Sequence, residues 1–186
     1  MLSFSRSALI DADVLIYVTD VVETIATTQT PKAQVGEIAF LECVSVNKTG
    51  AFLATNGGLW ERNEDVVTEL AEFNSADPEA VGKEVSFKVF MTDSTLTIVG
   101  RGMVFKRIDD GSPGELQGAW LMSGRKRDGE IQQRDTSRPR KTMKILSGTR
   151  FQWIAYNTET KQFMGTGGGT YTTIDGKYTE NIEFFW

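Results

Sequence analysis

The chain contains no histidine and a single cysteine, Cys43, among its 186 residues. The lack of histidine removes Ser-His and Cys-His nucleophile pairs, histidine-ligated zinc and any imidazole acid–base step. A single cysteine excludes an intrachain disulfide and provides no metal cluster. Catalysis would have to depend on Asp, Glu, Lys, Tyr, Arg or a borrowed cofactor. The composition therefore favours a protein that is not an enzyme, and we expect neither a metal nor a cofactor.

Long apolar runs are also missing. No window approaches the roughly 18 consecutive apolar residues of a membrane span. Near the N-terminus, Asp11 and Asp13 interrupt what would be the apolar stretch of a signal peptide. A cytoplasmic protein, and a secreted or periplasmic protein whose leader has been removed, fit the sequence equally well.

Positive charge is scarce except in one segment. The net charge of −5 argues against general nucleic-acid binding, yet residues 125–144 contain eight basic residues against three acidic ones. One interpretation is a solvated loop on an acidic protein. The other is a basic rim for an anionic ligand or surface.

Two segments of the chain resemble each other at a spacing of 111 residues. FLATNGGLWERNEDVVTELAEF (52–73) aligns without gaps on FMGTGGGTYTTIDGKYTENIEF (163–184), and eight of the 22 positions are identical. A period of this length indicates duplicated domains, because solenoid units run about 20–50 residues. We predict one repeat over 1–110 and a second over 114–186, which lacks the last strands of the first.

Strand-forming residues alternate with turn signals along nearly the whole chain. The predicted strands are 8–18, 35–46, 51–61, 66–73, 85–91, 95–100, 102–108, 119–127, 142–147, 150–157, 162–173 and 177–185. Only 78–83 has the character of a helical turn. Short strands joined as successive hairpins predict an all-β fold, an antiparallel meander that closes into a barrel.

The glycine run GTGGG (165–169) does not match a phosphate-binding loop. A Walker loop needs Gly-Lys-Ser/Thr before a helix, and Thr170 stands where a dinucleotide fingerprint has its last glycine. Because the strand-like TYTT follows, we predict a bulge or sharp bend within a hairpin, with close approach of a ligand as the alternative. Gly57-Gly58 in the first copy supports the structural interpretation.

A carboxylate lies on the more apolar strand face in both copies: Glu180 shares a face with Tyr178, and Glu69 shares one with Val67. A carboxylate inside a barrel needs a partner or a proton, and Arg150 is a candidate partner for Glu180. The alternatives are a structural anchor near a barrel end, a polar anchor in a ligand cavity, and a general acid or base. The candidate ligand-binding residues are Glu180, Tyr171, Tyr178, Trp153, Arg150, Glu69 and Trp60.

Gly118-Ala119-Trp120 resembles the Gly-x-Trp that opens lipocalin barrels. With the blocks RFQWIAYNTETKQFMGTGGGTYTT and YTENIEFF, the chain is similar to tandem lipocalin-like (calycin) domains of uncharacterised function, closely over 114–186 and more loosely over 1–110. The resemblance implies an antiparallel barrel with a small-molecule cavity.

In that family pattern the tryptophan plugs the closed end of the barrel, often stacked on an arginine from the last strand. The resemblance therefore assigns the plug to Trp120. At a spacing of 111 residues the first copy has Ser7-Ala8-Leu9, so no plug is expected there, although Lys106 or Arg107 could supply the basic half.

The second copy stops at EFFW without the strands that follow residue 84 in the first. A barrel of about five strands leaves an open edge. Three explanations fit: a fragment or natural truncation, a composite sheet in which 85–108 serves both copies, or a second molecule that completes the barrel as an oligomer.

The leading hypothesis is a non-enzymatic, lipocalin-like binding protein for a small, largely apolar ligand. One alternative is a structural or interaction module with solid barrels and an exposed edge or basic loop. The other is a small isomerase or cyclase that uses Glu180 with Tyr171 or Arg150.

Overall fold

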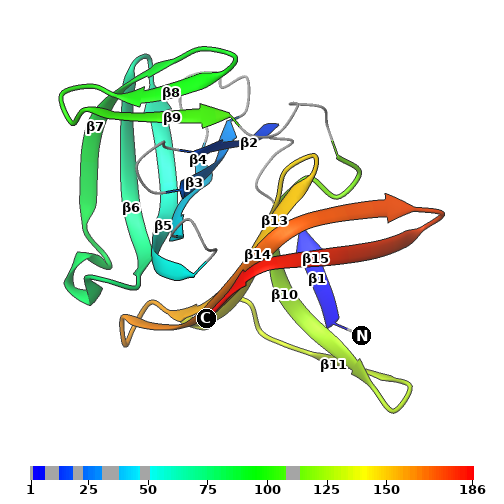
Figure 1. Ribbon diagram of the computed structural model, residues 1–186. Helices are drawn as coiled ribbons and strands as arrows, with labels where there is room; N and C mark the ends of the chain where they lie inside the picture. Colours follow the sequence, from blue (N-terminus) through cyan, green and yellow to red (C-terminus); the bar gives the residue numbers. More distant parts are fainter. Residues whose placement is uncertain (1, 7–12, 19–22, 31–37, 47–50, 108–113) are drawn as a thin grey trace.

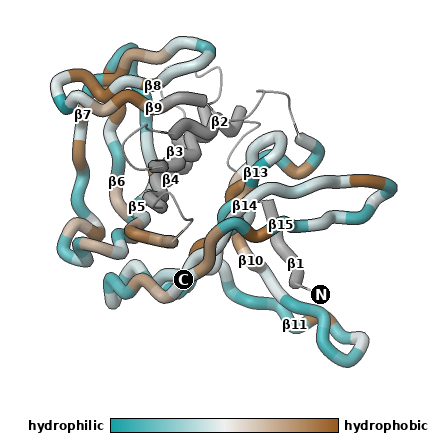
Figure 2. Tube along the Cα trace, viewed as in Figure 1, coloured by the Kyte–Doolittle hydropathy of each residue, from teal (hydrophilic) through white to brown (hydrophobic). Residues whose placement is uncertain are grey.

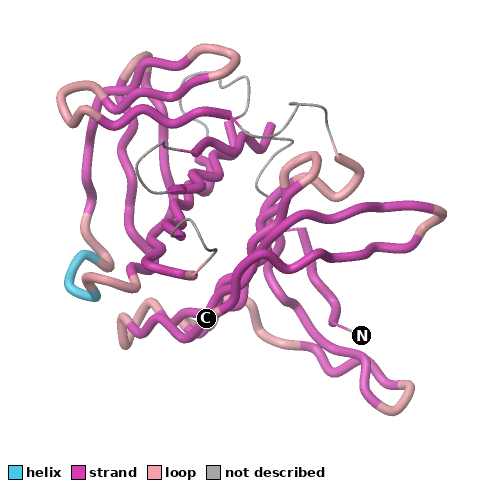
Figure 3. The backbone as a smooth tube through the Cα atoms, in the orientation of Figure 1, coloured by secondary structure: helices cyan, strands magenta, loops and turns pink. Residues whose placement is uncertain are grey.

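The computed structural model describes residues 2–6, 13–18, 23–30, 38–46, 51–107 and 114–186, and it describes side chains over 51–105 and 114–186. The described chain is all-β, as predicted (Figures 1 and 3). The strands are β1 (Leu2–Arg6), β2 (Asp13–Val18), β3 (Glu23–Thr30), β4 (Ile38–Val46), β5 (Phe52–Asn63), β6 (Val66–Asn74), β7 (Glu84–Met91), β8 (Thr95–Ile98), β9 (Met103–Arg107), β10 (Gly118–Arg127), β11 (Glu130–Gln133), β12 (Arg140–Leu146), β13 (Arg150–Asn157), β14 (Gln162–Ile174) and β15 (Lys177–Phe185). The expected helical turn is the 3₁₀ helix η1 (Pro78–Ala80), where the Asp77 carboxylate accepts from the Glu79 N–H.

Strands β2 to β9 form a closed barrel in which each strand pairs antiparallel with the next. The barrel closes where β9 returns to β2, with Tyr17 opposite Arg107 and Val18 opposite Lys106. This is the predicted antiparallel meander. Closure removes the free sheet edges that such a meander would otherwise expose.

The second sheet is open. Its order is β1-β10-β12-β13-β14-β15, and β11 pairs with the outer part of β10 as a hairpin. The first strand of the chain therefore lies in this sheet, whereas the sequence placed it in the first repeat. The composite-sheet explanation is wrong for the described strands, because β7, β8 and β9 all pair within the barrel.

The two copies share their irregularities as well as their sequence. The pairing of β5 with β6 has a bulge opposite Gly57 and Gly58, where Glu72 is the extra residue of β6, and that of β14 with β15 has one opposite Gly168 and Gly169, where Glu183 is the extra residue of β15. A Cβ on Gly58 would collide with the Leu70 carbonyl oxygen, and one on Gly169 would collide with the Asn181 carbonyl oxygen. The glycines are thus required by close backbone approach, and the predicted bulge in a hairpin is confirmed.

A second register shift is shared by the neighbouring strand pairs, β4–β5 and β13–β14. The register of β4 on β5 shifts between Ser45 and Val46, and that of β13 on β14 shifts between Ala155 and Tyr156. Backbone pairing therefore gives a residue-by-residue correspondence between β3–β6 and β12–β15. It also shows that β1 pairs with β10 as β9 pairs with β2, since Arg6 lies opposite Trp120 and Arg107 lies opposite Tyr17.

The barrel and the second sheet pack through their outer faces. Phe73 of β6 and its counterpart Phe184 of β15 share one buried cluster, which also contains Tyr156 at a ring-centroid distance of 5.0 Å from Phe73. The Gln152 amide donates to Thr166 at 2.9 Å and lies 3.5 Å from its counterpart Thr55. These contacts place β6 beside β13 and β14 (Figure 1).

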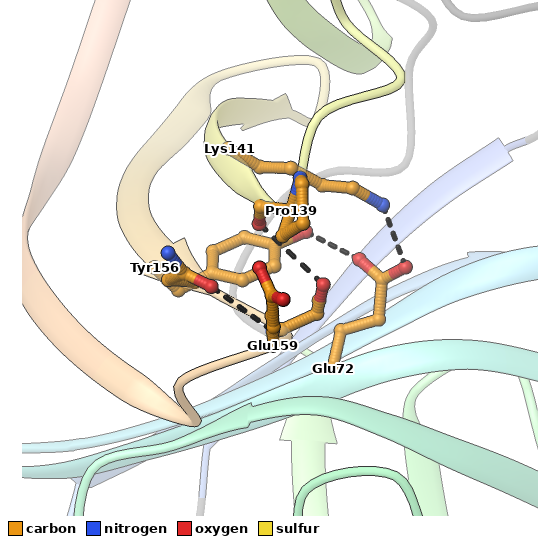
Figure 4. A network of polar contacts seen from close by, with 7 residues as sticks. Glu72, Pro139, Lys141, Tyr156 and Glu159 are labelled. Atoms are coloured by element: carbon orange, nitrogen blue, oxygen red, sulfur yellow. Dashed lines mark hydrogen bonds and ion pairs between the residues drawn. The ribbon is translucent and has the colours of Figure 1, made fainter.

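A polar network beside that cluster ties the two units together (Figure 4). Glu72 of β6 accepts from the Tyr156 hydroxyl at 2.5 Å and from the Lys141 ammonium at 2.9 Å. The Glu72 and Lys141 side chains are 12% and 22% exposed, so this ion pair is shielded from solvent. The rings of Phe52 of β5 and Phe163 of β14 are stacked 5.9 Å apart and form a further contact between the two units.

Candidate functional site

Trp60 and Glu69 lie opposite each other on β5 and β6. Trp60 is only 3% exposed and packs with Val67 and Val89. Because the adjacent Leu59 packs against the outer cluster, strand alternation directs Trp60 to the barrel interior. Two of the predicted ligand-binding residues therefore lie together inside the closed barrel.

Both side chains carry a buried polar atom without a hydrogen-bond partner, the Trp60 Nε1 and the Glu69 Oε1. Burial raises the pKa of Glu69 to about 7, and a hydrogen bond from Asn56 offsets only part of this effect. An unmade hydrogen bond in a buried group costs about 1–3 kcal/mol. This part of the barrel thus offers an unused donor beside an unused acceptor.

Tyr171 and Glu180 hold the same relation in the second sheet, opposite each other on β14 and β15. Here the carboxylate is satisfied, because the Lys144 ammonium of β12 binds Glu180. The same ammonium lies 5.2 Å from the ring centroid of Phe151 and 5.3 Å from that of Tyr178. These distances allow cation–π attraction in addition to the ion pair.

The aromatic residues around this ion pair form a packed group. The rings of Tyr171 and Tyr178 lie 5.4 Å apart, and the Tyr171 hydroxyl donates to the Ser147 carbonyl at 2.6 Å. Burial, followed by the nearby Glu180 carboxylate, raises the pKa of Tyr178, whose hydroxyl is buried without a hydrogen-bond partner. Burial and the charge of Glu115 raise that of Tyr171. Both phenol side chains therefore stay neutral at the pH values at which proteins function.

Arg150 is not the partner of Glu180. Its guanidinium binds Glu183, on the other face of the strand, because residues 150 and 151 of β13 point to opposite sides. Trp153 packs against the cluster of Leu146, Phe151 and Tyr171, and its ring lies 5.7 Å from that of Phe185. Of the residues predicted from the sequence, two therefore line the barrel, four gather in the second sheet and Arg150 stands apart.

Trp120 packs on Leu146, Phe151 and Tyr171, and its indole N–H donates to the Leu116 carbonyl at 2.8 Å. Backbone pairing places it opposite Arg6 of β1. The corresponding residue of the barrel is Tyr17, opposite Arg107, and not Ser7-Ala8-Leu9, which lie outside the described residues. The spacing of 111 residues applies to β5–β6 and β14–β15, whereas Tyr17 and Trp120 are 103 residues apart.

Lys144 and Asn56 are neighbours of the two carboxylates that the sequence pattern did not single out. Thr142, Lys144 and Leu146 share one face of β12, so period-2 alternation could have placed this lysine opposite the aromatic strands. Asn56 shares one face of β5 with Trp60, so the same alternation could have placed it near Glu69.

The basic segment divides into a packed part and an exposed part. Lys141 and Lys144 are held by Glu72 and Glu180, and the Arg134 guanidinium donates to the Arg140 carbonyl at 2.5 Å. The β10–β11 hairpin is exposed and hydrophilic, as its teal colour in Figure 2 shows. This hairpin and the 135–138 loop, in which the Arg138 side chain is 75% exposed, match the interpretation of a solvated loop.

No family model, curated protein or solved structure matches the chain. Within the described residues, no helix has the length and apolar character needed to cross a membrane.

Proposed function

We propose that the closed barrel binds a small, largely apolar ligand beside Trp60 and Glu69. The supporting observation is the pair of buried polar atoms without partners, which lies among the described apolar side chains of Val67, Val89 and Phe87. An apolar wall with a few convergent polar groups is typical of small-molecule sites, and an eight-stranded barrel can hold one small ligand. The lipocalin-like resemblance leads to the same proposal.

The isomerase or cyclase alternative is less well supported. It requires Glu180 to act with Tyr171 or Arg150, whereas Glu180 is bound by Lys144 and Arg150 by Glu183. A general base must reach the proton that it removes, and the Glu180 carboxylate is already occupied by the Lys144 ammonium. We therefore place the ligand in the barrel and assign the second sheet a structural role.

Displacement of a bound fluorophore tests this proposal. N-phenyl-1-naphthylamine, a neutral hydrophobic probe, should bind the full chain with one site, and lipids should displace it. Trp60→Phe removes the unused donor and should weaken the displacing ligand at least several-fold. The matched control is Tyr171→Phe, at the corresponding position of the second sheet, which should leave binding unchanged. Absence of probe binding, or equal loss in both variants, would contradict the proposal.

A second candidate role is self-association through the open sheet. Its edge strands are β15 and β1, and the barrel places two further strands, β7 and β8, between the corresponding strands β6 and β9. Phe185 is 71% exposed, and Ile182 and Trp186 are also exposed. We propose that a second copy pairs with this edge. Sedimentation should show a dimer that Ile182→Lys abolishes, whereas a monomer at all concentrations would exclude it.

A further inference from the structure

The duplicated carboxylates differ in what they bind. Glu69 and Glu180 hold the same position in their hairpins, opposite Trp60 and Tyr171. Glu180 binds the Lys144 ammonium, whereas among the described side chains none forms an ion pair with Glu69. Because the two sites hold corresponding positions of the repeated sequence, the Lys144–Glu180 pair indicates that an ammonium group satisfies the carboxylate at this position.

Backbone pairing identifies the barrel residue that stands where Lys144 stands in the second sheet. The barrel partners Gly58, Leu41 and Thr28 correspond, strand by strand, to Gly169, Phe151 and Leu146. Two residues earlier on β3 and β12 are Ala26, opposite Cys43, and Lys144, opposite Trp153. The barrel therefore has an alanine at the register position of the lysine.

The barrel thus lacks the ammonium group that Lys144 supplies in the second sheet, but it retains the carboxylate, Glu69. A buried acceptor without a partner is costly, and a buried carboxylate is best satisfied by a cation that also donates hydrogen bonds. We infer that the ligand of the barrel is a primary alkyl amine whose ammonium binds Glu69, as the Lys144 ammonium binds Glu180. This inference rests on the proposed function and names its ligand class.

The surroundings define the rest of the ligand. Val67 and Val89 are buried beside Trp60, and Phe87 and Met91 pack against them, so the alkyl part meets an apolar wall. An ammonium only donates hydrogen bonds, whereas the Trp60 N–H needs an acceptor. An amine with a neighbouring hydroxyl or carbonyl oxygen would satisfy both atoms and should bind more tightly than the plain amine.

The test compares n-octylamine with 1-octanol as displacers of N-phenyl-1-naphthylamine from the full chain at pH 8. The two displacers share an eight-carbon chain and differ in the headgroup. We expect the amine to displace the probe at a concentration at least tenfold lower than the alcohol. Glu69→Gln should abolish this preference and retain alcohol binding, because the amide keeps the size of the side chain and loses its charge.

Two further variants exploit the repeat. Ala26→Lys gives the barrel its own ammonium and should abolish amine binding. Glu180→Gln, at the corresponding position of the second sheet, should leave the amine preference intact. Circular dichroism of each variant checks that the fold is retained, and Glu69→Gln alone decides the case if Ala26→Lys does not fold.

The outcomes separate the inference from the proposed function. If the probe binds but octylamine displaces it no better than octanol, or if Glu69→Gln keeps the preference, the amine assignment is wrong and ligand binding stands. If neither the probe nor any displacer binds, the proposed function itself fails.

Discussion

Glu69 and its counterpart Glu180 differ in their energetics. A carboxylate with its Oε1 buried and unpaired favours the protonated form, and burial raises its pKa to about 7. Its counterpart Glu180 has an ammonium partner. The same residue of the same repeat is thus satisfied within the chain in one copy and left unsatisfied in the other.

The raised pKa of Glu69 predicts a pH-dependent stability. Between pH 4.5, the pKa of the unfolded state, and pH 7, the folded chain holds the proton more tightly, so the free energy of unfolding falls as pH rises through this window. The total loss is about 3 kcal/mol, reached above pH 7. Below pH 4.5 both states are protonated and this group contributes no slope.

Glu69→Gln should remove this slope and stabilise the chain at pH 8. Urea unfolding at pH 4.5, 6 and 8 gives the measurement. A variant that loses stability between pH 4.5 and 8 by the same amount as the wild type would show that Glu69 is not the buried titrating group.

The positions of Glu69 and Glu180 could be predicted because strand alternation fixes the face of each side chain. The partner of Glu180 could not be predicted in this way. Arg150 of β13 points to the face that carries Glu183 and not to the face that carries Glu180. Lys144 reaches Glu180 from β12. Identifying an ion pair requires the order of strands in space, which the local pattern does not contain.

At the scale of elements, the Lys144–Glu180 pair links β12 to β15 across β13 and β14. The two side chains are 16% and 26% exposed, so removing one partner leaves a poorly solvated charge. Lys144→Met should therefore lower the free energy of unfolding by about 2 kcal/mol, and adding Glu180→Gln should restore most of it. A double-mutant cycle by urea unfolding measures the coupling, and additive losses would mean that the pair contributes no coupling.

The hairpins β5–β6 and β14–β15 were predictable because each carries its own signal: alternating residues, glycines at the bulge and a tight turn. Strands β1, β3 and β11 were not predicted. The β1 strand pairs with β10, more than 100 residues away in the chain, and the EIQQ of β11 has a single apolar residue, Ile131. Strands β1 and β11 form because a neighbour supplies hydrogen bonds, whereas β3, ETIATTQT, was missed although its threonines and isoleucine favour a strand.

At the scale of the whole molecule, the barrel and the sheet share one buried cluster that joins Phe73 and Phe184. The outer faces of the two predicted copies therefore pack against each other. Sequence reasoning found the repeat but not this packing, because an outward-facing phenylalanine on a barrel strand looks the same whether it is covered by a second sheet or by another chain.

Phe73→Ala should separate the two units. Phe73 is 1% exposed, so its truncation should cost about 3–5 kcal/mol and weaken the near-ultraviolet circular dichroism of Tyr156, which it contacts. Leu53→Ala, at a position 52% exposed in the same hairpin, is the control and should change stability by less than about 0.5 kcal/mol. Equal effects of both substitutions would contradict the packing.

The indole N–H resonances provide the most direct test that the barrel interior beside Trp60 and Glu69 is the binding site. The chain has four tryptophans, so a ¹H–¹⁵N spectrum contains four indole signals, and Trp60→Phe identifies the one from the barrel. Saturation with an octyl-chain ligand should shift the Trp60 signal and leave those of Trp120 and Trp153 in place. A ligand that binds while the Trp60 signal stays unmoved would contradict the account.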